Sequence, residues 1–188
     1  MANLNQNDRF LVVAEVTESF YPYIAGQFCG TSVPVLYGPP IPISAPVSGL
    51  RKVNPDVGGD PVLDSQASFC VVWEQRNASQ ADIHSARVFL DGRVMNERWF
   101  DTSEHDDVRP RISKSNGKGR FGDLSRTWNI VFERTDTSSL HTTQMSVDNA
   151  LTPITEAIRA RVGQPAVSSV TDEIGGHRYW MVAYAQTA

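Results

Sequence analysis

Apolar residues along this chain are grouped in short runs that recur at a regular interval. The clearest run is an aromatic residue, a variable residue, two aliphatic residues, an apolar residue and then, in three copies of four, glutamate. Its copies span residues 10–15, 69–74, 128–133 and 179–184, so their first residues are 59, 59 and 51 positions apart. A period of this size is typical of stacked supersecondary units. The runs are rich in Val, Ile and aromatics, which predicts strands buried on both faces.

Two further phrases accompany this run. A proline phrase precedes three copies, and we predict a strand that begins at each proline, where no ladder hydrogen bond is lost. The three prolines are Pro55, Pro110 and Pro165. An apolar phrase follows the first three copies and predicts a third strand at residues 23–28, 82–88 and 139–145. Asp91-Gly92 then lies between apolar stretches and predicts a hairpin with a type I′ turn, in which both residues have positive φ.

These elements form a repeating unit of four strands. The predicted fold class is therefore mainly β, with about three to three and a half β-propeller-type, four-stranded antiparallel blades. We expect a single repeat domain over 1–188, with blades at 9–50, 51–104 and 105–162 and a partial blade at 163–188. The aliphatic pairs Val71-Val72 and Ile130-Val131 are expected to pack between blades. A two-sheet sandwich is the alternative, but it does not predict self-similarity at a fixed period.

Two regions depart from the repeat. Residues 33–48 hold five of the eleven prolines, which favours an extended segment at an outer edge over a central strand. Residues 146–163 carry apolar residues at helical spacing, namely Leu151, Ile154, Ile158 and Val162. We predict a short helix near 147–162, with a bent edge strand as the alternative.

The second unit carries a family resemblance. It contains Pro55-Asp56-Val57, Val71-Val72-Trp73-Glu74, Asp82-Ile83 through Val88, and Asp91-Gly92. In this order the phrases resemble the blade repeats of secreted bacterial β-propeller proteins, of the sialidase-like and FG-GAP-like kinds. The resemblance extends from Asn54 to Tyr184, about two thirds of the chain, and implies a partial propeller from an exported or cell-surface protein. The full Asp-box pattern of sialidases is absent, so no catalytic residue is carried over.

Charge and hydropathy narrow the classes of partner. The net charge is −4 and no long Lys/Arg cluster occurs, so we expect no nucleic-acid partner. No apolar run reaches 18 residues, so no membrane span is expected. The N-terminal residues do not resemble a signal peptide, which predicts either a cytoplasmic protein or a piece of a longer exported one. The family resemblance favours the exported protein.

The number of repeated phrases bears on assembly. The aromatic-aliphatic run occurs four times, whereas the proline phrase and the third-strand phrase each occur three times. We therefore expect either a homo-oligomer that completes the ring or a longer parent polypeptide.

Candidate chemistry is sparse. Cys29 and Cys70 allow a bridge between adjacent blades if the chain is exported, or two buried free thiols. The four histidines show no metal-ligand spacing. Asn54, Asp56 and Asp60 form an oxygen-rich run, for which turn chemistry and a calcium site are both considered. No other cofactor is expected.

The recurring glutamates bear on enzymatic activity. Glu15, Glu74 and Glu133 occupy one repeat position, which favours a structural role, such as a bond to a neighbouring blade, over glycoside hydrolysis. Our first hypothesis is a non-catalytic ligand-binding or assembly module that binds carbohydrate through exposed aromatics. These are Tyr21, Tyr23, Tyr37 and Trp99, with Phe100 beside them. The alternatives are a sialidase-type propeller enzyme and a structural subunit of a homo-oligomer.

Overall fold

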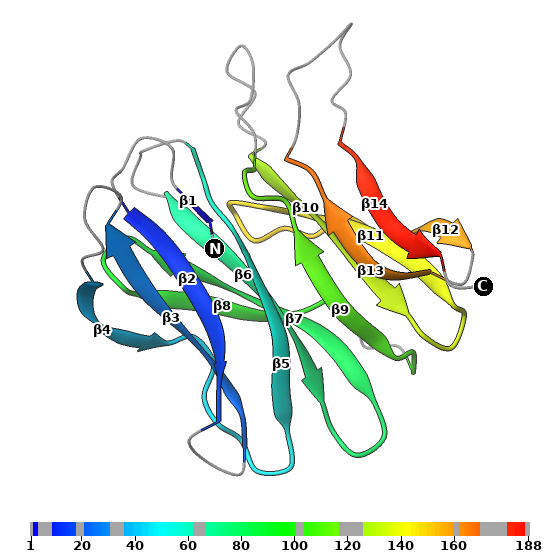
Figure 1. Cartoon of the computed structure of the whole chain (residues 1–188), viewed down its shortest axis with the longest axis horizontal. Helices are drawn as coiled ribbons and strands as arrows, with labels where there is room; N and C mark the ends of the chain where they lie inside the picture. Colours follow the sequence, from blue (N-terminus) through cyan, green and yellow to red (C-terminus); the bar gives the residue numbers. More distant parts are fainter. Residues whose placement is uncertain are drawn as a thin grey trace, which may run out of the picture.

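The computed structural model describes residues 2–3, 9–17, 21–30, 36–61, 67–100, 104–116, 126–159, 162–169 and 180–186. These residues form antiparallel β-sheets and no helix, so the mainly β prediction is confirmed (Figure 1). Within this described part, no helix of the length and apolarity needed to cross a membrane occurs.

Each sheet is a meander of strands that are consecutive in the sequence. Sheet 1 contains β1 (Ala2–Asn3), β2 (Arg9–Val16), β3 (Tyr23–Gly30) and β4 (Leu36–Pro42). Sheet 2 contains β5 (Arg51–Gly58), β6 (Ser68–Arg76), β7 (Ala81–Phe89) and β8 (Val94–Trp99). Sheet 3 contains β9 (Asp107–Ile112), β10 (Thr127–Arg134), β11 (Ser139–Ser146) and β12 (Thr155–Arg159). Sheet 4 contains β13 (Val162–Val167) and β14 (Val182–Gln186).

The repeated phrases occupy equivalent strands. The aromatic-aliphatic run forms the second strand of the first three sheets, namely β2, β6 and β10. The apolar phrase that follows it forms the third strand, namely β3, β7 and β11. The self-similarity in the sequence therefore corresponds to one strand order that is used again in each sheet.

The prolines lie inside strands, not at their first residues, so that prediction was wrong. In sheets 2, 3 and 4, a non-glycine residue with φ of 53° and the proline after it form a β-bulge. The three residues with this φ are Asn54, Arg109 and Gln164. Each bulge sets two residues of the first strand opposite one residue of the second, where the proline's missing N–H interrupts no regular ladder.

The bulges also correct the register of the fourth copy. The residues opposite the bulges are Trp73 in sheet 2, Phe132 in sheet 3 and Tyr184 in sheet 4. Tyr184 is therefore equivalent to Trp73, and the copy spans 180–185 instead of 179–184. Ala185, and not Tyr184, occupies the position of the recurring glutamate.

The predicted helix near 147–162 is wrong. Leu151 forms a bridge to Met145, and β12 pairs with β11, as in the alternative of a bent edge strand. Leu151 and Ile154 pack against an apolar cluster from an extended backbone. Pro153, within this segment, lacks a backbone N–H for a helix interior, and a register shift in the β11–β12 ladder removes the simple alternation of a strand.

The hairpin prediction at Asp91-Gly92 is correct, although the turn type differs. The β7–β8 pair is antiparallel, and the N–H of Gly92 donates to the carbonyl of Phe89 (2.9 Å). Gly92 has φ of 86°, whereas Asp91 is not among the residues with positive φ. This pattern fits a type I turn followed by a left-handed glycine, since a type I′ turn needs positive φ at both residues.

The core lies between the sheets. Val71 belongs to a buried cluster shared by sheets 1 and 2, and Val72 to a second cluster shared by sheets 2 and 3. Ile130 joins the second cluster and Val131 is fully buried on the other face of β10. Sheet 2 is thus covered on both faces, as expected for its almost continuously apolar second strand.

Successive sheets contact one another in the same way. β2 contacts β5, β6 contacts β9, and β10 contacts β13, so the second strand of one sheet meets the first strand of the next. The first strands of these sheets also contact one another, β5 with β9 and β9 with β13, and Gly59 and Ser115 form a parallel bridge just beyond β5 and β9. Figure 1 shows β9 and β13 running side by side where sheets 3 and 4 meet.

Candidate functional site

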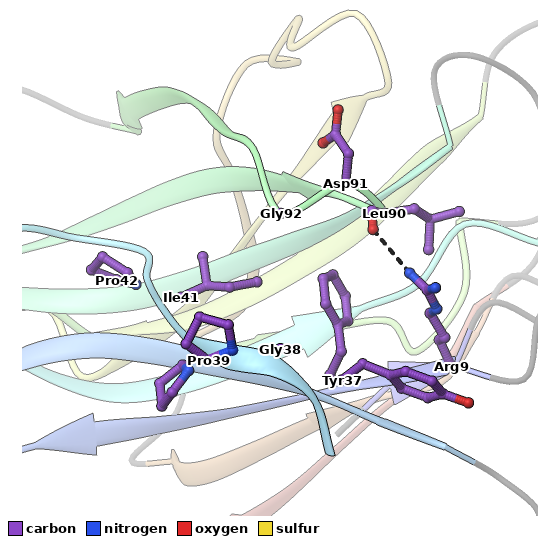
Figure 2. Close-up of a pocket in the computed structure, with 11 residues that line it drawn as sticks. Arg9, Tyr37, Gly38, Pro39, Ile41, Pro42, Leu90, Asp91 and Gly92 are labelled. Atoms are coloured by element: carbon purple, nitrogen blue, oxygen red, sulfur yellow. Dashed lines mark hydrogen bonds between the residues drawn. The ribbon is translucent and has the colours of Figure 1, made fainter. Parts of the chain in front are cut away.

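A pocket of about 530 Å³ lies between the outer strand of sheet 1 and the β7–β8 turn of sheet 2 (Figure 2). β4 supplies its longest wall, from Tyr37 to Pro42, and Leu90 to Gly92 form the opposite side. Arg9 and Phe28 complete the lining from β2 and β3. The pocket therefore depends on how two consecutive sheets meet.

The wall formed by β4 is extended and rich in proline, as expected for an outer edge. β4 is the last strand in the order of sheet 1, and Pro39, Pro40 and Pro42 are exposed. Gln27 Nε2 donates to the carbonyls of Tyr37 (3.2 Å) and Gly38 (3.1 Å), which holds β4 near β3 where proline cannot donate. Pro34, in the same run, lies outside the described residues.

Arg9 joins the two sides of the pocket. Its Nη1 donates to the carbonyl of Leu90 (3.2 Å), and its guanidinium lies 4.9 Å from the centroid of the Tyr37 ring. Figure 2 shows this side chain reaching from β2 toward Leu90 beside Tyr37. A cation over an aromatic face is attracted to the ring and restricts its orientation.

Asp91 contributes negative charge at the rim. The pKa of its carboxyl lies below the ordinary value because Arg93 donates a side-chain and a backbone hydrogen bond to it. Asp91 is therefore ionised at neutral pH. The pocket thus combines an anionic acceptor, a guanidinium, an accessible aromatic ring and the apolar side chains of Ile41 and Leu90.

Of the four aromatics predicted to bind a ligand, Tyr37 lines this pocket. Tyr21 lies just before β3, where its hydroxyl accepts a hydrogen bond from Ser48 Oγ (3.0 Å). Tyr23 is half-buried at the start of β3. Trp99 is exposed at the end of β8, with its ring 5.1 Å from that of His84. The four side chains therefore do not share one site.

The three residues considered for calcium have separate partners. Asn54 Nδ2 donates to Glu74 Oε2 (3.0 Å). Asp56 accepts from the backbone N–H of Ile112 (3.1 Å) and pairs with Lys114. Asp60 is fully buried and lies 3.3 Å from Arg126 Nη1. Over the described ranges, no group of three or more His, Cys, Asp or Glu could hold a metal ion.

Two of the three recurring glutamates, Glu74 and Glu133, bind the next sheet, as proposed from their repetition, whereas Glu15 is exposed. Glu74 accepts from the backbone N–H of Arg109 (3.0 Å), and Glu133 accepts from that of Gln164 (2.7 Å). Both donors are the bulge residues with positive φ. Each carboxylate also pairs with an arginine: Arg76 with Glu74, and Arg109 with Glu133 (2.7 Å).

A second pocket of about 430 Å³ lies between sheets 2 and 3 and is mostly polar. Arg76 and Arg109 line it, but their guanidiniums pair with the glutamates just described. None of its described lining residues is aromatic, so the first pocket is the stronger candidate. Cys29 and Cys70 are both free thiols, and Cys70 is fully buried.

Sequence reasoning missed most of the first pocket. Arg9 and Leu90 gave no motif, because their contact joins residues 81 positions apart. The Asp91-Gly92 phrase was the available signal, since it marked a turn between exposed segments. A comparison with protein-family models found no match, and neither did a comparison with curated proteins.

Proposed function

We propose that this chain is a non-catalytic ligand-binding module built from β-propeller blades, and that carbohydrate binds in the pocket between β4 and the β7–β8 turn. The observation that carries the proposal is the combination of Tyr37, Arg9 and Asp91 around one opening. The resemblance of the repeats to secreted bacterial propeller proteins adds that the module belongs to an exported protein.

The propeller interpretation is supported by the repeated relation between sheets. Three four-stranded meanders follow one another, and each second strand contacts the first strand of the next sheet. Radial stacking of such units buries both faces of each sheet, and pockets then form where neighbouring blades diverge. In this interpretation sheets 1 to 4 are the blades predicted over 9–50, 51–104, 105–162 and 163–188.

The chemistry of the pocket suits a sugar. A pyranose has one apolar C–H face and a rim of hydroxyl groups. The face would stack on Tyr37, which is 38% exposed, and on the prolines of β4. Hydroxyl groups would donate to Asp91, which carries no proton at neutral pH, and accept from Arg9.

A glycan array followed by calorimetry with the best ligand tests this proposal. We expect Tyr37→Ala and Asp91→Asn each to weaken binding at least about tenfold, which corresponds to about 1.4 kcal/mol. Tyr21→Ala is the matched control, because Tyr21 is also 38% exposed but lies outside the pocket. Circular dichroism of each variant checks the fold.

Two results would contradict the proposal. One is that no glycan is retained by the wild-type chain at millimolar concentration. The other is that Tyr21→Ala weakens binding as much as Tyr37→Ala. A parallel hydrolysis screen with the same glycans tests the enzyme alternative. Release of product would show that the chain is a glycosidase and not a non-catalytic binding module.

A further inference from the structure

The two internal interfaces between four-stranded sheets follow one rule. In the second strand, alternate residues point to opposite faces. The face toward the preceding sheet carries Phe69, Val71 and Trp73 in sheet 2, and Trp128, Ile130 and Phe132 in sheet 3. All six side chains are fully buried. A face of this kind is therefore covered by another sheet of the same repeat at both places where the structure shows it.

The same face of sheet 1 is covered by no other sheet among the described residues, and its Val12 and Ala14 are exposed. The equivalent residues of β2 are Phe10, Val12 and Ala14, because Leu11 points into the cluster shared with sheet 2. Val12 is 37% exposed, against 0% for its counterpart Val71. Cys29 pairs opposite Phe10, and Leu36 beside it is 65% exposed.

Sheet 4 presents the complementary face. With the corrected register, its outward residues in the segment 181–185 are Met181, Ala183 and Ala185. Met181 is 68% exposed and the two alanines are exposed. They are equivalent to Cys70, Val72 and Glu74, the side chains that sheet 2 turns toward sheet 3.

We propose that the outward face of sheet 1 binds the outward face of sheet 4 of a second copy of this chain. By repeat position, the two faces are equivalent to the two sides of the interface that joins sheet 2 to sheet 3. Ala185 takes the place of the buried carboxylate, so this contact would bury apolar surface without an ion that needs a partner. Such a contact joins different surfaces of the two copies, and it closes into a ring when the rotation permits.

Light scattering coupled to size exclusion tests the contact. We expect the wild-type chain to have a mass of two or more times 20.8 kDa. Val12→Glu and Met181→Glu should each reduce the mass to that of one chain, because each buries a charge in the contact. Met95→Glu is the control: Met95 is 40% exposed on β8, outside both faces, and this variant should keep the wild-type mass.

Alkylation of Cys29 adds a second measurement. Cys29 lies on the outward face of sheet 1, opposite Phe10. Cys70 is fully buried, so its thiol should not react in the time over which Cys29 is alkylated. Met181→Glu alters sheet 4, yet it should expose Cys29 and speed its alkylation at least about tenfold, as expected for loss of a protein cover. If Val12→Glu does not fold, the mass of Met181→Glu and its rate of Cys29 alkylation still test whether the contact exists.

The proposal is overturned if the wild-type chain has the mass of one copy at the highest soluble concentration. It is also overturned if Met181→Glu folds and keeps both the wild-type mass and the wild-type rate of Cys29 alkylation. It does not depend on carbohydrate binding, so the glycan experiment leaves it unaffected.

Discussion

Replacement of Glu74 by glutamine should weaken the junction between sheets 2 and 3. The Glu74 side chain is fully buried. Its Oε2 accepts from the backbone N–H of Arg109 and from Asn54 Nδ2, both at 3.0 Å, and its Oε1 accepts from Arg76. Glutamine keeps one oxygen and replaces the other by an NH₂ group, so one set of donors loses its acceptor.

The size of the effect follows from these partners. Hydrogen bonds to a charged group contribute about 1.5–3 kcal/mol, and a buried donor left without an acceptor costs about 1–3 kcal/mol. The ion pair with Arg76 adds little, because the Arg76 side chain is 46% exposed and is screened by water. We therefore expect Glu74→Gln to lower the free energy of unfolding by about 2 kcal/mol.

Urea unfolding followed by tryptophan fluorescence measures this loss, because Trp73 and Trp128 are fully buried. Glu15→Gln is the matched control: it is the same substitution at the same repeat position, but Glu15 is exposed and the loss should stay below about 0.5 kcal/mol. Equal losses at positions 15 and 74 would refute the reasoning.

Two further predictions concern packing and pH. Gly58→Ala should cost about 1–3 kcal/mol in thermal unfolding, because a Cβ there would lie 2.3 Å from the carbonyl oxygen of Ser113; Gly163→Ala, whose nearest atoms are 3.9 Å away, should be close to neutral. Burial, and then the charge of Arg134, lower the pKa of His141 in the folded chain below its ordinary value of 6.5. The unfolded state therefore takes up the proton more readily, so stability should fall as pH drops from about 7.5 to 5.5. His141→Gln should flatten this dependence, and a rise in stability toward low pH would contradict it.

The strands were predictable where one physical demand dominated. The runs at 69–74 and 128–133 are almost continuously apolar up to their final glutamate because their strands are covered on both faces, and such a pattern is readable without coordinates. The bulges were not readable in the same way. A residue before proline normally prefers extended backbone, whereas Arg109 has φ of 53°, and the carboxylate of Glu74 that binds its N–H lies 35 positions away.

The failures of the sequence reasoning have a common cause. Leu151 and Ile154 have helical spacing because they meet the core from a bent, extended segment, and spacing alone does not distinguish the two. The pocket likewise depends on a contact between Arg9 and Leu90 in different sheets. Local patterns predicted most of the strands, while long-range contacts decided how the strands bend and where the pocket forms.

The prolines of β4 affect the tendency of sheet 1 to pair, edge to edge, with a strand of another chain. Strand β4 is the rim of sheet 1, and along it Pro39, Pro40 and Pro42 have no hydrogen to offer to an incoming strand. Lateral extension of the sheet by another polypeptide is thereby disfavoured at this rim. The same prolines that line the pocket therefore also disfavour aggregation by strand addition at this edge.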